Sequence, residues 1–148
     1  MARKKVPVDK NNGREIFRFL QKSYDEAFEL LVSSRDYFSD RGKTDKMLLS
    51  KEDQLVYTLA VSTITTQLTS VMSWLLLCKA VEQGEISRKQ LRSGSFEMPE
   101  FNLGINEKDS CFSILNKKTR EFLSKSCNLY NRMKRMESSI REQLLEVI

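Results

Sequence analysis

Histidine is absent from this sequence of 148 residues. Because histidine is the usual general base near neutral pH and the commonest metal ligand, its absence disfavours Ser-His and Cys-His nucleophiles and imidazole-bound metals. The five glycines are dispersed along the chain, whereas a phosphate-binding loop needs clustered glycines after a strand. The sequence therefore predicts a protein that is not an enzyme and that has no metal site and no cofactor.

Residues that break helices are also scarce, with 2 prolines and 5 glycines in the whole chain. Such low counts disfavour a loop-rich or all-β protein, whereas leucine, lysine, glutamate and arginine are abundant, as helices prefer. A chain of this length fits one ordinary domain. We expect an all-α fold with a single helical-bundle domain over residues 14–148.

Long apolar runs are missing as well. The most apolar stretch, residues 71–78, is followed at once by Lys79 and is far shorter than the ~20 residues that span a bilayer. The N-terminus has no apolar stretch of the kind that signal peptides contain. Three cysteines without C-x-x-C spacing, Cys78, Cys111 and Cys127, indicate reduced thiols in a core. These features predict a cytoplasmic protein without a membrane partner.

The net charge of +5 comes mostly from the start of the chain. Only Asp9 opposes the basic residues there, which are Arg3, Lys4, Lys5, Lys10 and Arg14. We expect a basic, disordered leader over residues 1–13. An alternative is a DNA-associated regulatory protein that uses this arm, whose DNA affinity would fall with salt and with removal of residues 1–14. The balanced charge of the remaining chain disfavours nucleic acid as a partner.

Apolar residues recur at spacings of three and four in three segments, which predicts three long amphipathic helices. The first runs from about Gly13 to Asp40 and should end near Gly42 in a left-handed conformation. The third runs from about Glu107 to the end of the chain. Sustained heptad-like spacing favours packing at small crossing angles, so we expect three long helices in an antiparallel bundle.

The central helix should begin at Ser50 as its N-cap, end at Gly84 and be about 50 Å long. It carries two apolar seams roughly 100° apart, which is more than a peripheral helix needs. The two apolar seams together therefore predict a homodimer. The seam that we expect at a subunit or partner interface contains Thr63, Ser70, Trp74, Leu77 and Val81. The alternative places Trp74 in the core of its own chain.

An irregular linker at about residues 91–106 follows, because Gly94, Pro99 and Gly104 forbid a continuous helix. Its apolar residues should fold onto the bundle as a clasp, although a partner-binding motif is a second interpretation. The candidate contact residues of this region are Arg88, Arg92, Phe96, Met98 and Phe101.

Residues 59–86 resemble the family of the regulator of CtrA degradation, RcdA. The features that carry the resemblance are the pair Thr65-Thr66, Leu68, the W-L-L block at 74–76 and the A-V-x-x-G-E-I sequence at 80–86. Residues 24–38 agree more weakly. Together the similar stretches cover about a third of the chain.

This resemblance implies a dimeric three-helix bundle that acts as a non-catalytic adaptor for the ClpXP protease. Such an adaptor would bridge a small response regulator on the protease and a cargo transcription regulator, and would act in cell-cycle control. A structural helical dimer with no link to a protease is the other interpretation.

Overall fold

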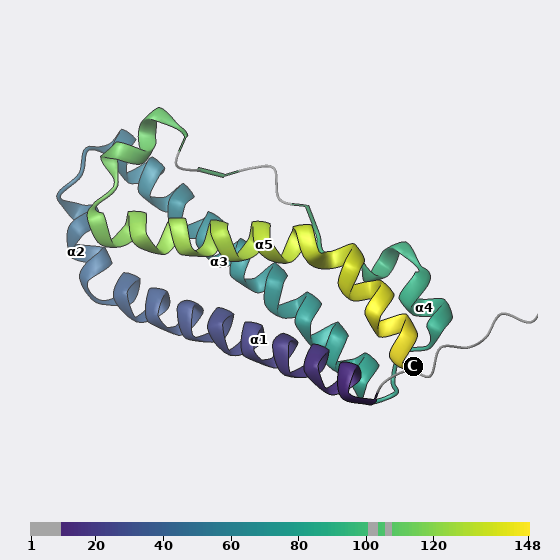
Figure 1. The fold of residues 1–148 in the computed structure, drawn as a ribbon. Coiled ribbons are helices and arrows are strands. Elements are labelled where there is room, and N and C mark those ends of the chain that lie inside the picture. The colour runs from purple at the N-terminus through teal and green to yellow at the C-terminus, as the bar shows by residue number, and fades with distance from the viewer. Residues whose placement is uncertain (1–9, 101–103, 106–107) are drawn as a thin grey trace, which may run out of the picture.

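A computed structural model describes residues 10–100, 104–105 and 108–148, and within these ranges the chain forms helices and no strand. The elements are α1 (Lys10–Ser39), α2 (Arg41–Met47), α3 (Lys51–Glu82), α4 (Arg88–Arg92), η1 (Gly94–Phe96), η2 (Ser110–Ile114) and α5 (Lys117–Val147). The long helices α1, α3 and α5 lie side by side in one bundle, with α2 at one end and α4 at the other (Figure 1). The predicted all-α class is confirmed.

The helix directions follow from contacts at the two ends of the bundle. Phe38 packs against Tyr57 with ring centroids 5.8 Å apart, and Asn116 Nδ2 donates to Tyr37 Oη at 3.1 Å. These contacts place the end of α1 beside the starts of α3 and α5. Helix α1 is therefore antiparallel to both, whereas α3 and α5 run in the same direction (Figure 1).

Helix α1 is antiparallel to both neighbours, as in the antiparallel bundle that we predicted, but α3 and α5 run parallel to each other. Parallel neighbours need a connection that returns along the whole bundle. The segment from Gln83 to Asn116 is long enough to do so, because an extended residue spans about 3.3 Å.

Side-chain oxygens cap the N-termini of α3 and α5 by accepting from free backbone amides. Ser50 Oγ accepts from the Asp53 amide at 3.2 Å, and Gly84 ends α3 with a φ of +77°. Both boundaries confirm the sequence prediction. The third helix differs, since it begins at Lys117 rather than near Glu107. Its cap is Asn116, whose Oδ1 accepts from the Thr119 amide at 2.8 Å.

Gly42 has another role than the one we predicted. The first long helix ends at Ser39, and Gly42 lies inside the short helix α2 without a positive φ. A Cβ atom at this position would lie 2.5 Å from Tyr57 Oη and 3.1 Å from a ring carbon of Phe38. Glycine is needed here because α2 approaches these two rings closely.

The core fills the space between the three long helices. A polar contact inside it joins α3 to α5: Ser126 Oγ and Cys127 Sγ both donate to Gln67 Oε1, at 3.1 Å and 3.3 Å. Buried polar groups need such partners, so this contact favours one axial register of the two helices. The largest fully buried aliphatic side chains are Ile64, Leu68, Leu91, Leu123, Leu129, Ile140 and Leu144.

Most of the predicted basic leader lies outside the described residues, which begin at Lys10. Residues 10–13, which we had assigned to the leader, belong to α1. Gly13 is buried, and a Cβ there would lie 3.1 Å from a methyl carbon of Val147. The start of α1 therefore packs against the end of α5.

Gly42→Ala tests the close approach of α2. We expect the free energy of unfolding to fall by about 1–3 kcal/mol, because the new methyl group must displace the Tyr57 hydroxyl or the Phe38 ring. Urea unfolding followed by circular dichroism measures the change. The control is Gly94→Ala, where a Cβ meets nothing within 4 Å and φ is not positive. Equal stabilities of the two variants would contradict this explanation.

Candidate protein-binding surfaces

Reactive groups do not gather at any one place in the described residues. No group of three or more histidine, cysteine, aspartate or glutamate side chains there could hold a metal ion. Burial raises the pKa of the Cys78 thiol to about 12, and burial likewise raises the pKa of Tyr57 to about 12. Both groups stay protonated near neutral pH. What stands out in the described part of the chain is apolar surface.

The outward side of α3 is the most unusual of these surfaces. No charged residue occurs from Gln54 to Cys78, although the solvent side of a bundle helix is normally charged. We call this surface the α3 outer face. Its leucines lie near the two ends, with exposed fractions of 72% for Leu55, 45% for Leu59, 51% for Leu76 and 37% for Leu77. Exposed hydroxyl residues lie between them: Thr58, Ser62, Thr65, Thr69 and Ser73.

The threonine hydroxyls of the α3 outer face already have acceptors. Thr58, Thr65 and Thr69 each donate to the carbonyl four residues earlier, at 2.9, 2.9 and 2.6 Å. Burying a hydroxyl is costly mainly when its hydrogen bond is lost. Because these bonds lie within the helix, another protein can cover the face without leaving those hydrogens unpaired.

Helix α3 is long and apolar enough to cross a membrane by length and composition alone. Its opposite side, however, packs against α1 and α5 and includes Ile64, Leu68 and Val71, which are at most 1% exposed. A helix in the core of a bundle can have the same length and apolar composition.

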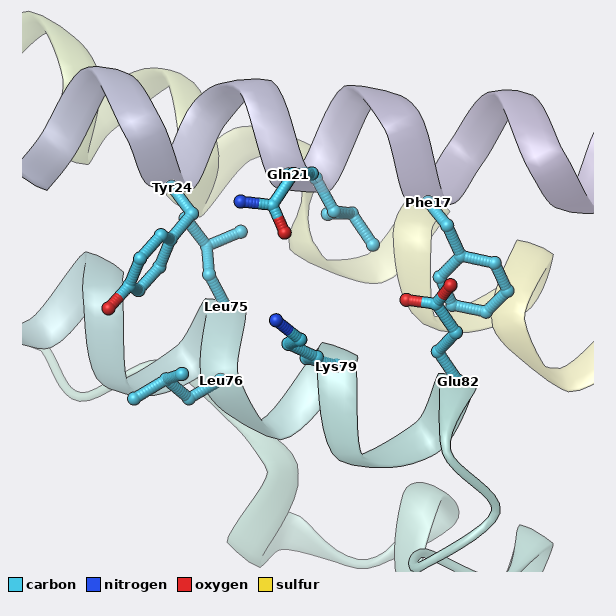
Figure 2. A pocket seen from close by; sticks show the side chains of 8 residues that line it. Phe17, Gln21, Tyr24, Leu75, Leu76, Lys79 and Glu82 are labelled. Carbon is cyan, nitrogen blue, oxygen red and sulfur yellow. The ribbon is translucent and has the colours of Figure 1, made fainter.

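A pocket between α1 and α3 adjoins the outer face, since Leu76 belongs to both. It is a small hollow of about 80 Å³, and its lining is polar and apolar in nearly equal parts. Figure 2 shows the Gln21 amide and the Lys79 ammonium group pointing toward each other across it. The ring of Tyr24 stacks on that of the exposed Phe28 with centroids 6.4 Å apart. The other lining residues are Phe17, Leu20, Leu75 and Glu82.

The predicted interface seam of α3 contains both buried and accessible residues. Trp74, Val81 and Thr63 are each 1% exposed and are covered by their own chain, so they present no surface to a partner. Of the two interpretations of Trp74, the structure therefore matches the core one. Ser70 is half-buried and Leu77 is exposed, so these two residues remain on the accessible side.

The cover over Trp74 is the linker. Trp74 Nε1 donates to the Phe96 carbonyl at 3.0 Å, and the two rings meet edge to face. Phe96 and Met98 are buried, as a clasp requires, and they offer no apolar surface to a partner. We call residues Phe96–Pro99 the clasp. Of the other candidate contact residues, Arg88 and Arg92 are exposed, and Phe101 lies outside the described residues.

Side chains of α5 bind the main chain of the clasp. The buried Glu137 accepts from the Met98 amide at 2.8 Å and pairs with Lys134 at 3.2 Å. Lys134 Nζ also donates to the Met98 carbonyl, and Tyr130 Oη donates to that of Pro99, each at 2.6 Å. A buried carboxylate is tolerated only with such partners.

Our sequence reasoning missed the residues that hold the clasp. One signal was available, because Glu137 lies four residues after Met133 and three before Ile140, within the apolar stripe of the third helix. A charged residue at a core position indicates a buried partner.

Comparison with known proteins places the chain in a family. Residues 15–146 match the family described as "Protein of unknown function (DUF1465)". The chain belongs to this family. No curated protein matches the DUF1465 chain.

A solved structure shares the fold of this DUF1465 chain: the crystal structure of RcdA from Caulobacter crescentus CB15, with a TM-score of 0.63 and 22% sequence identity. The match covers 82% of this chain and 91% of that chain. The resemblance to RcdA that residues 59–86 predicted is confirmed at the level of the fold.

Glu137→Ala should release the clasp of this DUF1465 protein. Removing the carboxylate leaves the Met98 amide without its acceptor and Lys134 without its ion pair, so we expect a loss of about 3 kcal/mol in the free energy of unfolding. Trp74 is the only tryptophan, and its emission should shift to the red as the clasp loosens.

Glu142→Ala, an exposed site on the same helix, is the control and should change stability by no more than about 0.5 kcal/mol. An unshifted emission maximum in Glu137→Ala would contradict the role given to this carboxylate.

Proposed function

We propose that this protein is a non-catalytic adaptor of the RcdA type, which assists regulated proteolysis of a cell-cycle transcription regulator by ClpXP. The observation that carries the proposal is the α3 outer face, a charge-free and partly apolar surface on a helix of 32 residues. Large exposed apolar surfaces mark sites of protein interaction. The RcdA-like fold supports the adaptor role. We propose the ClpXP protease and a response regulator as partners because of the same similarity to RcdA.

An adaptor needs surfaces rather than a reactive group. Weak contacts to several proteins add up when one scaffold holds them together, since the second contact becomes intramolecular. The bundle supplies such a scaffold, and the small α1–α3 pocket with Gln21 and Lys79 offers polar and apolar contacts beside the α3 outer face. Arg88 and Arg92 of α4 add exposed basic side chains to the accessible surface.

Self-association through the α3 outer face is part of the proposal. Leu55 and Leu59 lie near one end of this face and Leu76 and Leu77 near the other, with small hydroxyl residues between them. In a symmetric antiparallel pair, the first leucine pair of one copy meets the second pair of the other, as a two-fold interface requires. The small residues at the centre allow the two helices to approach closely.

Leu59→Glu tests this dimer, because it places a charge on the exposed face without disturbing the core. We expect the unchanged protein to be a dimer at micromolar concentration and Leu59→Glu to be a monomer, as measured by sedimentation equilibrium. The matched control is Leu48→Glu, since Leu48 is 82% exposed and lies off this face. An unchanged protein that remains monomeric at high concentration would refute the dimer.

Affinity purification tests the adaptor role. We expect the tagged full chain to recover ClpX or a response regulator from a lysate of the organism that produces it, identified by mass spectrometry. The version that lacks residues 1–9, which precede α1, should recover them equally well, because the proposal assigns no binding to the basic arm. Recovery of neither protein would argue against the proposal, and loss of both on truncation and on nuclease treatment would favour the DNA-associated alternative.

A further inference from the structure

The clasp is bound as a peptide ligand is bound, by side chains that contact its main chain. The carbonyls of Phe96, Met98 and Pro99 accept from Trp74, Lys134 and Tyr130 at 3.0, 2.6 and 2.6 Å. The Met98 amide donates to Glu137 at 2.8 Å. Side chains of α3 and α5 thus bind four main-chain groups of the clasp, whereas the Phe96 and Glu97 amides donate to Ser93 and Gly94 within η1, at 3.2 and 3.3 Å.

The side chains of the clasp alternate between the interior and the solvent. Phe96 and Met98 are buried, whereas Glu97 and Pro99 are exposed. Phe96 is the last residue of η1, and the chain becomes extended at Glu97, with φ −81° and ψ 140°. Successive side chains of an extended segment point to opposite sides. Peptide-binding grooves use this alternation: main-chain hydrogen bonds give affinity, and pockets for every second side chain give specificity. The clasp shows both features.

The walls of this groove belong to the bundle and not to the linker. Trp74 comes from α3, and the α5 residues Tyr130, Lys134, Glu137 and Arg141 recur at spacings of four, three and four along one side of that helix. The Gln67 contact with Ser126 joins the two helices elsewhere along their length. The groove is therefore built by helix packing that does not include the clasp.

Charge adds a preference for an acidic ligand. Arg141 Nη2 lies 3.8 Å from the Glu97 carboxylate and 3.6 Å from that of Glu137. Its buried Nε has no hydrogen-bond partner. Lys134 also pairs with Glu137, so these two cations and one carboxylate together carry one net positive charge, which an acidic residue after the aromatic one can meet.

We propose that the groove formed by Trp74, Tyr130, Lys134, Glu137 and Arg141 is a binding site for an extended segment of a partner protein, with an aromatic, an acidic, an apolar residue and proline in order. Phe96–Pro99 occupies this site in cis as a built-in competitor. The inference does not depend on the adaptor role or on the α3 outer face, because all of its contacts lie within one chain.

Competition in cis sets how strongly such a partner can bind. The clasp is tethered at both sides, by α4 with its Ser87–Gln90 capping box and by the Ile105 amide, which donates to Thr63 Oγ1 at 3.3 Å. A short tether gives an effective concentration on the order of millimolar, and a ligand binds only the fraction of molecules with an open site. Weakening the clasp should therefore raise the affinity for a ligand added in trans.

The experiment uses the full-length double variant Phe96→Ala/Met98→Ala and a synthetic, end-blocked peptide with the sequence of residues 93–100. Trp74 emission reports binding, because the indole is the only one in the chain. We expect a saturable blue shift with the double variant and an affinity at least about tenfold higher than that of the unchanged protein. The same peptide with both alanines is the control and should give no shift.

Two results would overturn the proposal: a double variant that keeps its helical circular dichroism but does not bind the peptide at millimolar concentration, or equal binding of the peptide with both alanines. If the double variant loses its helices, the unchanged protein replaces it, with a peptide that carries a photoreactive phenylalanine at the position of Phe96. Crosslinks should map next to Trp74 on α3. Crosslinks at other positions, or none, would also overturn the proposal.

Discussion

The buried carboxylate of Glu137 is the interaction on which the closure of this fold depends. It accepts the Met98 amide and pairs with Lys134, whose ammonium group in turn binds the Met98 carbonyl. A carboxylate buried without partners would cost several kcal/mol, so Glu137 favours the closed position of the clasp. The clasp contacts in turn hold the returning connection against α3 and α5, which run parallel.

The sides of helix α3 have different surroundings. Two sides pack against α1 and α5, and a third is covered by the clasp at Trp74. The α3 outer face is left without cover and without charge from Gln54 to Cys78. The two seams that the sequence shows therefore have three partners within the chain, and the remaining apolar residues on α3 are those that we assign to a second copy.

The same groove explains how the protein can hold an irregular segment without a sheet. Side chains of α3 and α5 replace the hydrogen bonds that a neighbouring strand would supply. Main-chain recognition of this kind does not depend strongly on side-chain identity, apart from the two buried positions, Phe96 and Met98. A site that accepts its own linker is thus chemically suited to a similar segment of another protein.

Local signals explain what could be predicted. The helices, the Ser50 cap and the end of α3 at Gly84 follow from periodicity and capping, which involve residues only a few positions apart. The start of α5 was missed because the apolar pattern continues through Phe112 and Leu115, and the cap at Asn116 decides the boundary. We misinterpreted Gly42 because the residue that requires a glycine there, Tyr57, lies fifteen positions further along the chain.

By itself, the sequence determined the all-α class, the three long helices, the charge-free course of α3 and the resemblance to RcdA, since each depends on composition or short-range spacing. The tertiary structure alone decided the parallel direction of α5, the burial of Trp74 beneath the linker and the groove around Glu137. These features rest on contacts such as Trp74 with Phe96 and Met98 with Glu137, which join residues far apart in the chain. Periodicity within one helix carries no information about which distant segment will cover it.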